Sequence, residues 1–172
     1  MPNYVINEIV IPGVKLDDVR KHLFDRHGRF SFNVLLPLPL NYWRGNSFPD
    51  EDAFPGNPDD AAQDMWGTNA DAYGQSTAED SDEGLTIRFQ SSWEHPRGWV
   101  CALFNTVECD MTASWLSESG APSHIEAYIA EGKHGVPEWT DVILSTDSDE
   151  HRHLHKLLWG VEQFPVEDVG AR

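Results

Sequence analysis

Two stretches with a two-residue alternation constrain the fold more than any other feature of the sequence. Residues 3–11 are dominated by β-branched side chains, and residues 85–90 alternate Leu85, Ile87 and Phe89 with polar neighbours. Successive side chains of a strand point to opposite faces, so this pattern predicts β-strands. We expect residues 3–11 to form a central strand and residues 85–90 an antiparallel strand with one solvated face.

A helical spacing of apolar residues follows each of these stretches. The first helix begins after Pro12-Gly13 and ends before Gly28, and the second begins near Pro96, which suits a first helical turn. Their apolar stripes consist of Leu16, Val19 and Leu23 in the first helix and of Val100, Leu103, Phe104 and Val107 in the second.

The C-terminal half adds two more alternating stretches and a third helix. Alternating residues at 111–115 and 125–129 predict a pair of strands joined by a turn at 120–123. A short helix follows, capped by Asp147 or Asp149. Its apolar stripe consists of Leu154, Leu157, Leu158 and Val161.

Four intervening segments have weaker patterns. Residues 30–43 contain two prolines and predict an extended crossing segment without a regular helix. Residues 46–64 and 75–84 are polar and acidic, which is typical of solvated loops. Residues 66–73 carry aromatic anchors and predict a short strand between those loops.

The order β-α-(β)-β-α-β-β-α predicts one α+β domain over residues 1–172. We expect a ferredoxin-like, split βαβ antiparallel sheet with helices on one face, an added strand and a C-terminal helix. Residues 46–64 are then an acidic loop insertion, and residues 136–172 a C-terminal helical extension.

Negative charge is concentrated in the middle of the chain. The formal net charge is −17, and residues 46–83 contain eleven acidic residues and no Lys or Arg. Such a field repels phosphate backbones and attracts basic surfaces. The acidic residues are Asp50, Glu51, Asp52, Asp59, Asp60, Asp64, Asp71, Glu79, Asp80, Asp82 and Glu83.

Two interpretations of this acidic segment stay open. In the first, it is a solvated loop, as most charge runs are. In the second, its carboxylates imitate the phosphates of a nucleic acid and bind the Arg and Lys of a nucleic-acid-binding partner.

The two cysteines, Cys101 and Cys109, are too few for a disulfide framework or a four-cysteine metal site. The opening MPNYVINEIVIPG has no basic region before its apolar run, and Asn7 and Glu8 interrupt that run. We therefore expect no signal peptide, no membrane contact, no cofactor and a cytoplasmic location.

Three smaller groups of residues have some features of a binding or catalytic site. His151 and His155 have the spacing of two metal-binding imidazoles, but a solvated helix face is the simpler interpretation. Trp66-Gly67-Thr68 with Asp71 has the composition of a ligand site, but a packing role is the favoured interpretation. Trp93, Glu94 and His95 lie at a strand-to-helix junction whose backbone amides could bind an anion, but the Glu94 carboxylate would repel it. We expect neither a metal site nor a catalytic residue among them.

Several motifs resemble those of the YubB ferredoxin-like family of plasmid and phage proteins across roughly residues 1–135. They are the opening MPN, Pro37-Leu38-Pro39, Trp66-Gly67-Thr68-Asn69-Ala70-Asp71-Ala72, Phe89-Gln90-Ser91-Ser92-Trp93 before Pro96, and Tyr128 with Glu131-Gly132. The resemblance implies a ferredoxin-like fold and a mobile-element origin, and it brings no catalytic residues.

Three functions follow as hypotheses. The leading one is a non-enzymatic phage or plasmid protein that inhibits a host restriction or CRISPR enzyme by occupying the basic surface that binds nucleic acid. The second is a small-ligand-binding domain or a homodimer formed by sheet pairing at the strand near 124–131. The third is a metal-dependent hydrolase using His151, His155 and acidic residues.

Overall fold

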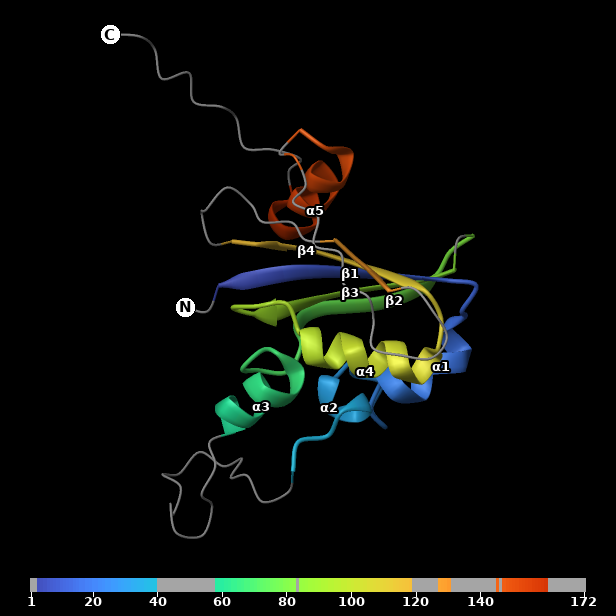
Figure 1. Cartoon of the computed structure of the whole chain (residues 1–172), viewed down its shortest axis with the longest axis vertical. Helices are drawn as coiled ribbons and strands as arrows, with labels where there is room; N and C mark the ends of the chain where they lie inside the picture. The colour runs from blue at the N-terminus through green and yellow to red at the C-terminus, as the bar shows by residue number, and fades with distance from the viewer. Residues whose placement is uncertain are drawn as a thin grey trace, which may run out of the picture.

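The computed structural model describes residues 3–39, 58–82, 84–118, 127–130, 145 and 147–160. Within them the chain forms both strands and helices, whose arrangement Figure 1 shows. In chain order they are β1 (Tyr4–Pro12), α1 (Leu16–Leu23), α2 (Phe32–Leu35), α3 (Pro58–Trp66), β2 (Tyr73–Asp80), β3 (Gly84–Ser92), α4 (Arg97–Val107), β4 (Met111–Ser117), β5 (Ala127–Ala130) and α5 (Asp149–Trp159).

The strands form one antiparallel sheet in the order β2-β3-β1-β4-β5. The central strand is β1, as its β-branched sequence predicts, and Ile9 pairs with Ile87 of β3 and with Ala113 of β4. Because every neighbouring pair is antiparallel, β1 runs parallel to β2 with β3 between them. By the same reasoning β3 runs parallel to β4 with β1 between them.

Helices cover both faces of this sheet. In Figure 1, α1, α2, α3 and α4 lie on one side and α5 lies on the other. The four-helix side encloses an aromatic core in which Phe32, Phe89 and Trp99 are fully buried. The α5 side buries a smaller cluster around Leu116 and Leu154. The expectation of helices on one face thus holds for α1 to α4, whereas α5 covers the opposite face.

Two segments expected to be loops are regular elements. Within 46–64, residues 58–64 belong to α3, which begins at Pro58 and has Asp59 and Asp60 in its first turn. Proline and carboxylates are favoured there because the first backbone N–H groups have no partner inside the helix. Within 75–84, β2 continues to Asp80 and pairs with β3. The remaining insertion residues, 46–57, lie outside the described residues.

Two further expectations were wrong in detail. Residues 66–73 are not a short strand, since α3 ends at Trp66, bends follow, and β2 begins at Tyr73. The segment 30–43 contains one helical turn, α2, capped by the Ser31 hydroxyl, which accepts from the Asn33 N–H at 3.2 Å. The N-cap of α5 is Ser148, which lies between the two aspartates expected there.

Cys101 and Cys109 are free thiols, both half-buried, and burial raises the pKa of Cys101. Among the helices that are described, none has the length and apolarity needed to cross a bilayer.

Candidate binding surface at helix α3 and Trp93

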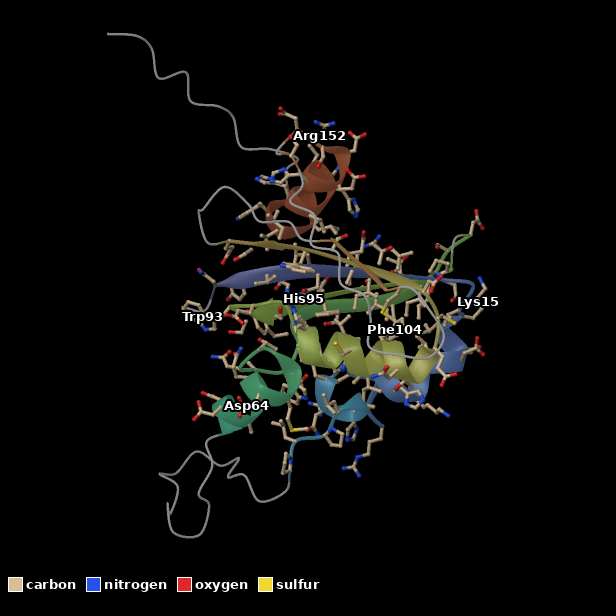
Figure 2. The ribbon with its side chains drawn as sticks, viewed as in Figure 1. Lys15, Asp64, Trp93, His95, Phe104 and Arg152 are labelled. Atoms are coloured by element: carbon tan, nitrogen blue, oxygen red, sulfur yellow. The ribbon has the colours of Figure 1, made fainter. Side chains whose placement is uncertain are left out.

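The structure separates the acidic residues of 46–83 into two groups. Helix α3 carries Asp59, Asp60 and Asp64, whereas Glu79, Asp80 and Asp82 lie at the β2–β3 hairpin. Figure 2 shows Asp64 at one end of the molecule and Lys15, whose Nζ donates to Ser81 O of the hairpin, at the other. Asp71 lies between these groups in sequence, and the remaining four candidates, Asp50, Glu51, Asp52 and Glu83, lie outside the described residues.

Two of these carboxylates hold the fold together. Asp71 accepts hydrogen bonds from the Ser31 hydroxyl at 2.5 Å and from the Phe32 N–H at 2.6 Å, which ties the start of α2 to the segment before β2. Asp80 accepts from the Leu16 N–H at 2.8 Å at the first turn of α1. Both oxygens of Asp71 are used within the fold, so it is a structural carboxylate rather than a free binding group.

The outer face of α3 is polar and exposed. Ala61, Ala62 and Trp66 are buried against the body of the protein. The exposed side chains between them are Asp59, Asp60, Gln63 and Asp64. Gln63 donates through Nε2 to Glu94 Oε2 at 3.2 Å, so this face continues onto the loop after β3.

That loop presents Trp93 to solvent. Its side chain is 49% exposed, and Trp93 is the exposed large hydrophobic residue among those described. Its backbone has φ 67°, a left-handed conformation that is a genuine outlier for a bulky residue. Figure 2 shows Trp93 at the same end of the molecule as Asp64. We call Asp59, Asp60, Gln63, Asp64, Trp93 and Glu94 the α3–Trp93 surface.

A buried polar network lies beneath this loop. Asn7 is fully buried and donates through Nδ2 to Val5 O at 3.0 Å and to Ser91 Oγ at 2.9 Å. Ser91 Oγ in turn donates to Glu94 O at 2.7 Å. The Asn7 oxygen lies 2.7 Å from His95 Nδ1. The network therefore joins the centre of β1 to both ends of the turn that carries Trp93.

Further contacts fix the same turn from its flanks. The Trp93 N–H donates to Asn3 O at 2.8 Å, and the Thr68 hydroxyl donates to Ser92 O at 2.6 Å. The Tyr73 hydroxyl donates to Ser91 O at 2.9 Å. Together these bonds hold an unfavourable backbone conformation in place, which is the situation in which strained residues persist.

Glu94 and His95 do not form an acid–base pair. Glu94 is exposed on the α3–Trp93 surface, whereas His95 is 7% exposed and stacks on Trp115 with ring centroids 3.9 Å apart. Burial, with a smaller contribution from the charge of Arg97, lowers the pKa of His95 to about 3. His95 is neutral at physiological pH and belongs to the interior.

The Trp66-Gly67-Thr68 stretch serves packing, which favours the structural interpretation of this motif. Trp66 donates through its indole N–H to Leu36 O at 2.7 Å. Gly67 has φ +86°, and a Cβ there would lie 2.9 Å from the Arg97 backbone nitrogen. The motif brings the end of α3 against the start of α4, and it thereby positions the α3–Trp93 surface.

On α5, His151 and His155 are buried rather than exposed to solvent. They are 5% and 6% exposed, with ring centroids 5.9 Å apart. Burial, and next the neighbouring His155, lowers the pKa of His151. Within the described part of the chain there is no group of three His, Cys, Asp or Glu residues arranged to hold a metal ion. The expectation of a solvated face is wrong for these two residues, although His153 is exposed.

Comparison of the chain with models of known protein families, with curated proteins and with solved structures finds no match. Sequence reasoning considered Trp93 only as part of a possible anion site with Glu94 and His95, and it did not select Asn7. The available signal was the position of Trp93 directly after a strand and directly before Glu94 and Pro96.

Proposed function

We propose that this protein is a non-enzymatic binding protein that occupies the basic, nucleic-acid-binding surface of a host enzyme of the restriction or CRISPR type. Carboxylates take the place of nucleic-acid phosphates, and the host protein supplies Arg and Lys. We also propose a ferredoxin-like fold, membership of the YubB family and an origin on a phage or plasmid. The motifs that resemble the YubB family support that origin.

The observation that carries the proposal is the row of exposed carboxylates on a supported helix face. Asp60 and Asp64 are one helical turn apart, about 6 Å along the axis. Glu94 extends the row through its hydrogen bond with Gln63. Carboxylates held on rigid elements lose little conformational freedom on binding, and charge-assisted bonds to Arg are among the stronger polar contacts.

The charge of the whole chain supports the same partner class. A net charge of −17 steers basic proteins toward this surface and keeps nucleic acid away from it. Steering of this kind weakens with ionic strength, because the Debye length falls from about 10 Å at 0.1 M salt to about 3 Å at 1 M. Binding to the partner should therefore weaken between about 50 and 500 mM salt.

The test is affinity capture from a nuclease-treated lysate of a bacterial host with three forms of the protein. The first is the parent chain. The second, the α3 variant, carries Asp59→Asn, Asp60→Asn, Asp64→Asn and Glu94→Gln. The third, the control variant, loses four charges elsewhere through Asp17→Asn, Glu79→Gln, Asp82→Asn and Glu150→Gln.

We expect the parent and the control variant to recover the same nucleic-acid-handling enzyme, and the α3 variant to lose it. Recovery that is equal for all three forms, or that does not change with salt, would contradict mimicry by this surface. Loss with both variants would assign binding to total charge rather than to α3.

A second candidate function is a homodimer formed by sheet pairing. It is favoured by the position of β5 (Ala127–Ala130), which is the last strand of the sheet within the described residues and so offers an edge. Light scattering after size exclusion would support it by giving twice the chain mass for both the parent and the α3 variant. A single chain mass at high protein concentration would exclude it.

A further inference from the structure

An exposed tryptophan lies beside carboxylates at the α3–Trp93 surface. Trp93 is 49% exposed, and its neighbour Glu94 is exposed and hydrogen-bonded to Gln63 on the outer face of α3. Tryptophan and arginine are enriched among the residues that dominate binding energy at protein interfaces. The position of Trp93 therefore indicates a contact with a particular side chain of the partner, in addition to a general attraction between opposite charges.

We propose that Trp93 is the anchor of the binding surface and that it receives an arginine side chain of the partner. The guanidinium stacks on the indole face, while the Glu94 carboxylate, with those of α3, accepts its N–H groups. This inference rests on the proposed function and adds the identity of the side chain that is recognised.

Arginine fits this arrangement better than lysine. Its guanidinium is planar and weakly hydrated, it stacks on aromatic rings, and its N–H groups form a fork that matches a carboxylate. Tryptophan is the ring that attracts a cation most strongly. A lysine ammonium would gain the charge attraction but neither the stacking nor the paired hydrogen bonds.

The rigidity of the turn supports an anchoring role. The backbone at Trp93 and directly before it is fixed by the Thr68, Tyr73 and Asn3 contacts. The Asn7 network fixes it from beneath. An anchor residue whose backbone is fixed before binding loses less conformational entropy when the partner arrives.

Other occupants fit the surface less well. A nucleobase would also stack on Trp93, but its phosphates would meet Glu94 and the carboxylates of α3. A second copy of this chain would bring a surface with the same net charge.

The test uses two labelled peptides of equal length, one with four arginines separated by glycines and one with four lysines in the same places. Their affinities for the parent chain, Trp93→Gly, Trp93→Phe and the α3 variant are measured by fluorescence polarisation at about 150 mM salt. Circular dichroism confirms that each form is folded. Trp93→Phe keeps an aromatic ring, so the test does not depend on a single substitution.

We expect Trp93→Gly to weaken arginine-peptide binding by about two- to fivefold, which corresponds to a cation–π contact at an exposed site. Lysine-peptide binding should change less, and Trp93→Phe should retain most of the arginine preference. If Trp93→Gly leaves both affinities unchanged while the α3 variant weakens both, the arginine contact is wrong and the charge-based function stands. If the α3 variant changes neither affinity, the charge-based function fails at this surface.

Two additional measurements exclude the other occupants. A labelled single-stranded oligonucleotide that binds the parent but not Trp93→Gly would overturn the proposal in favour of base stacking. If the parent has the mass of a dimer in solution and Trp93→Gly has the mass of a monomer, the proposal is overturned in favour of self-association.

Discussion

Asn7 and His95 meet inside the protein, with Asn7 Oδ1 and His95 Nδ1 2.7 Å apart. Because the Asn7 amide nitrogen donates to Val5 O and Ser91 Oγ, its oxygen is the group that faces the imidazole. That oxygen can only accept, so the neutral imidazole carries its proton on Nδ1. The pair links the central strand to the turn of the α3–Trp93 surface and makes the turn sensitive to protonation of His95.

This relationship predicts a pH-dependent stability. The pKa of His95 is lowered from 6.5 to about 3, so between these values the unfolded chain binds a proton that the folded chain does not. The contribution of His95 is therefore fully present above the unfolded pKa and falls as the pH drops toward the folded one. We expect the free energy of unfolding to lose on the order of 3 kcal/mol from this residue between about pH 7 and pH 4.

The measurement is urea unfolding of the parent and of His95→Gln over that pH range. Carboxylates titrate in both forms, so the difference between the two curves isolates His95. We expect the difference to shrink steadily as the pH falls. Two curves that stay parallel from about pH 7 to pH 4 would contradict a neutral buried His95.

The left-handed backbone at Trp93 predicts that Trp93→Gly is more stable than Trp93→Ala. Glycine ordinarily costs about 0.5–1 kcal/mol relative to alanine within regular structure. At φ 67° the order reverses, because a Cβ in the left-handed region costs about 1–2 kcal/mol. We expect Trp93→Gly to unfold at a higher urea concentration than Trp93→Ala. Since both lose the indole contacts, an equal or lower midpoint for Trp93→Gly would show that the turn relaxes after substitution.

The absence of a side chain at Gly98 allows α3 and α4 to approach each other closely. A Cβ at this position would lie 2.2 Å from the Met65 carbonyl oxygen, a backbone atom that cannot turn away. We expect Gly98→Ala to lower the free energy of unfolding by about 1–3 kcal/mol, as overpacking does.

A matched control for Gly98→Ala is Gly28→Ala. A Cβ at Gly28 would meet nothing within 4 Å, so only its φ of +76° opposes the substitution. If Gly98→Ala weakens partner binding and Gly28→Ala does not, the α3–α4 contact positions the binding surface. If both variants bind the partner equally well, α3 accommodates the added methyl group without displacing the binding surface.

Replacing Asp71 should lower stability, whereas replacing Asp64 should weaken binding with little effect on stability. Asp71→Ala leaves the Ser31 hydroxyl and the Phe32 N–H without their acceptor, which costs about 1–3 kcal/mol for a buried donor. Asp64 is exposed on α3, and its replacement by alanine should change stability by less than about 0.5 kcal/mol. Thermal unfolding and peptide binding separate the two roles. A destabilised Asp64→Ala would place Asp64 in the fold rather than on the surface.

Sequence reasoning recovered the elements that have one apolar face. Strands β1, β3 and β4 alternate clearly, and α4 carries an apolar stripe, because each buries one side against the same core. It missed β2, which lies at the edge of the sheet and has a half-buried, polar sequence from Tyr73 to Asp80. An edge strand needs no regular apolar face, so its sequence resembles that of a loop.

The candidate site could be predicted only in part. The carboxylates of α3 were selected, but their separation from those of the hairpin depends on where β2 runs. The exposure of Trp93 could not be predicted, because most tryptophans are largely buried. Its exposure depends on a turn held by Asn7, Thr68 and Tyr73, which are distant in sequence. No local pattern encodes such a set of contacts.

The central claim is that the α3–Trp93 surface occupies the site where a host enzyme binds nucleic acid. The most direct measurement titrates the protein into the captured enzyme bound to a fluorescent nucleic acid. We predict full displacement of the nucleic acid, a midpoint that rises in proportion to the nucleic-acid concentration, and no displacement by the α3 variant. A ternary complex of enzyme, nucleic acid and protein, or equal displacement by the α3 variant, would contradict the claim.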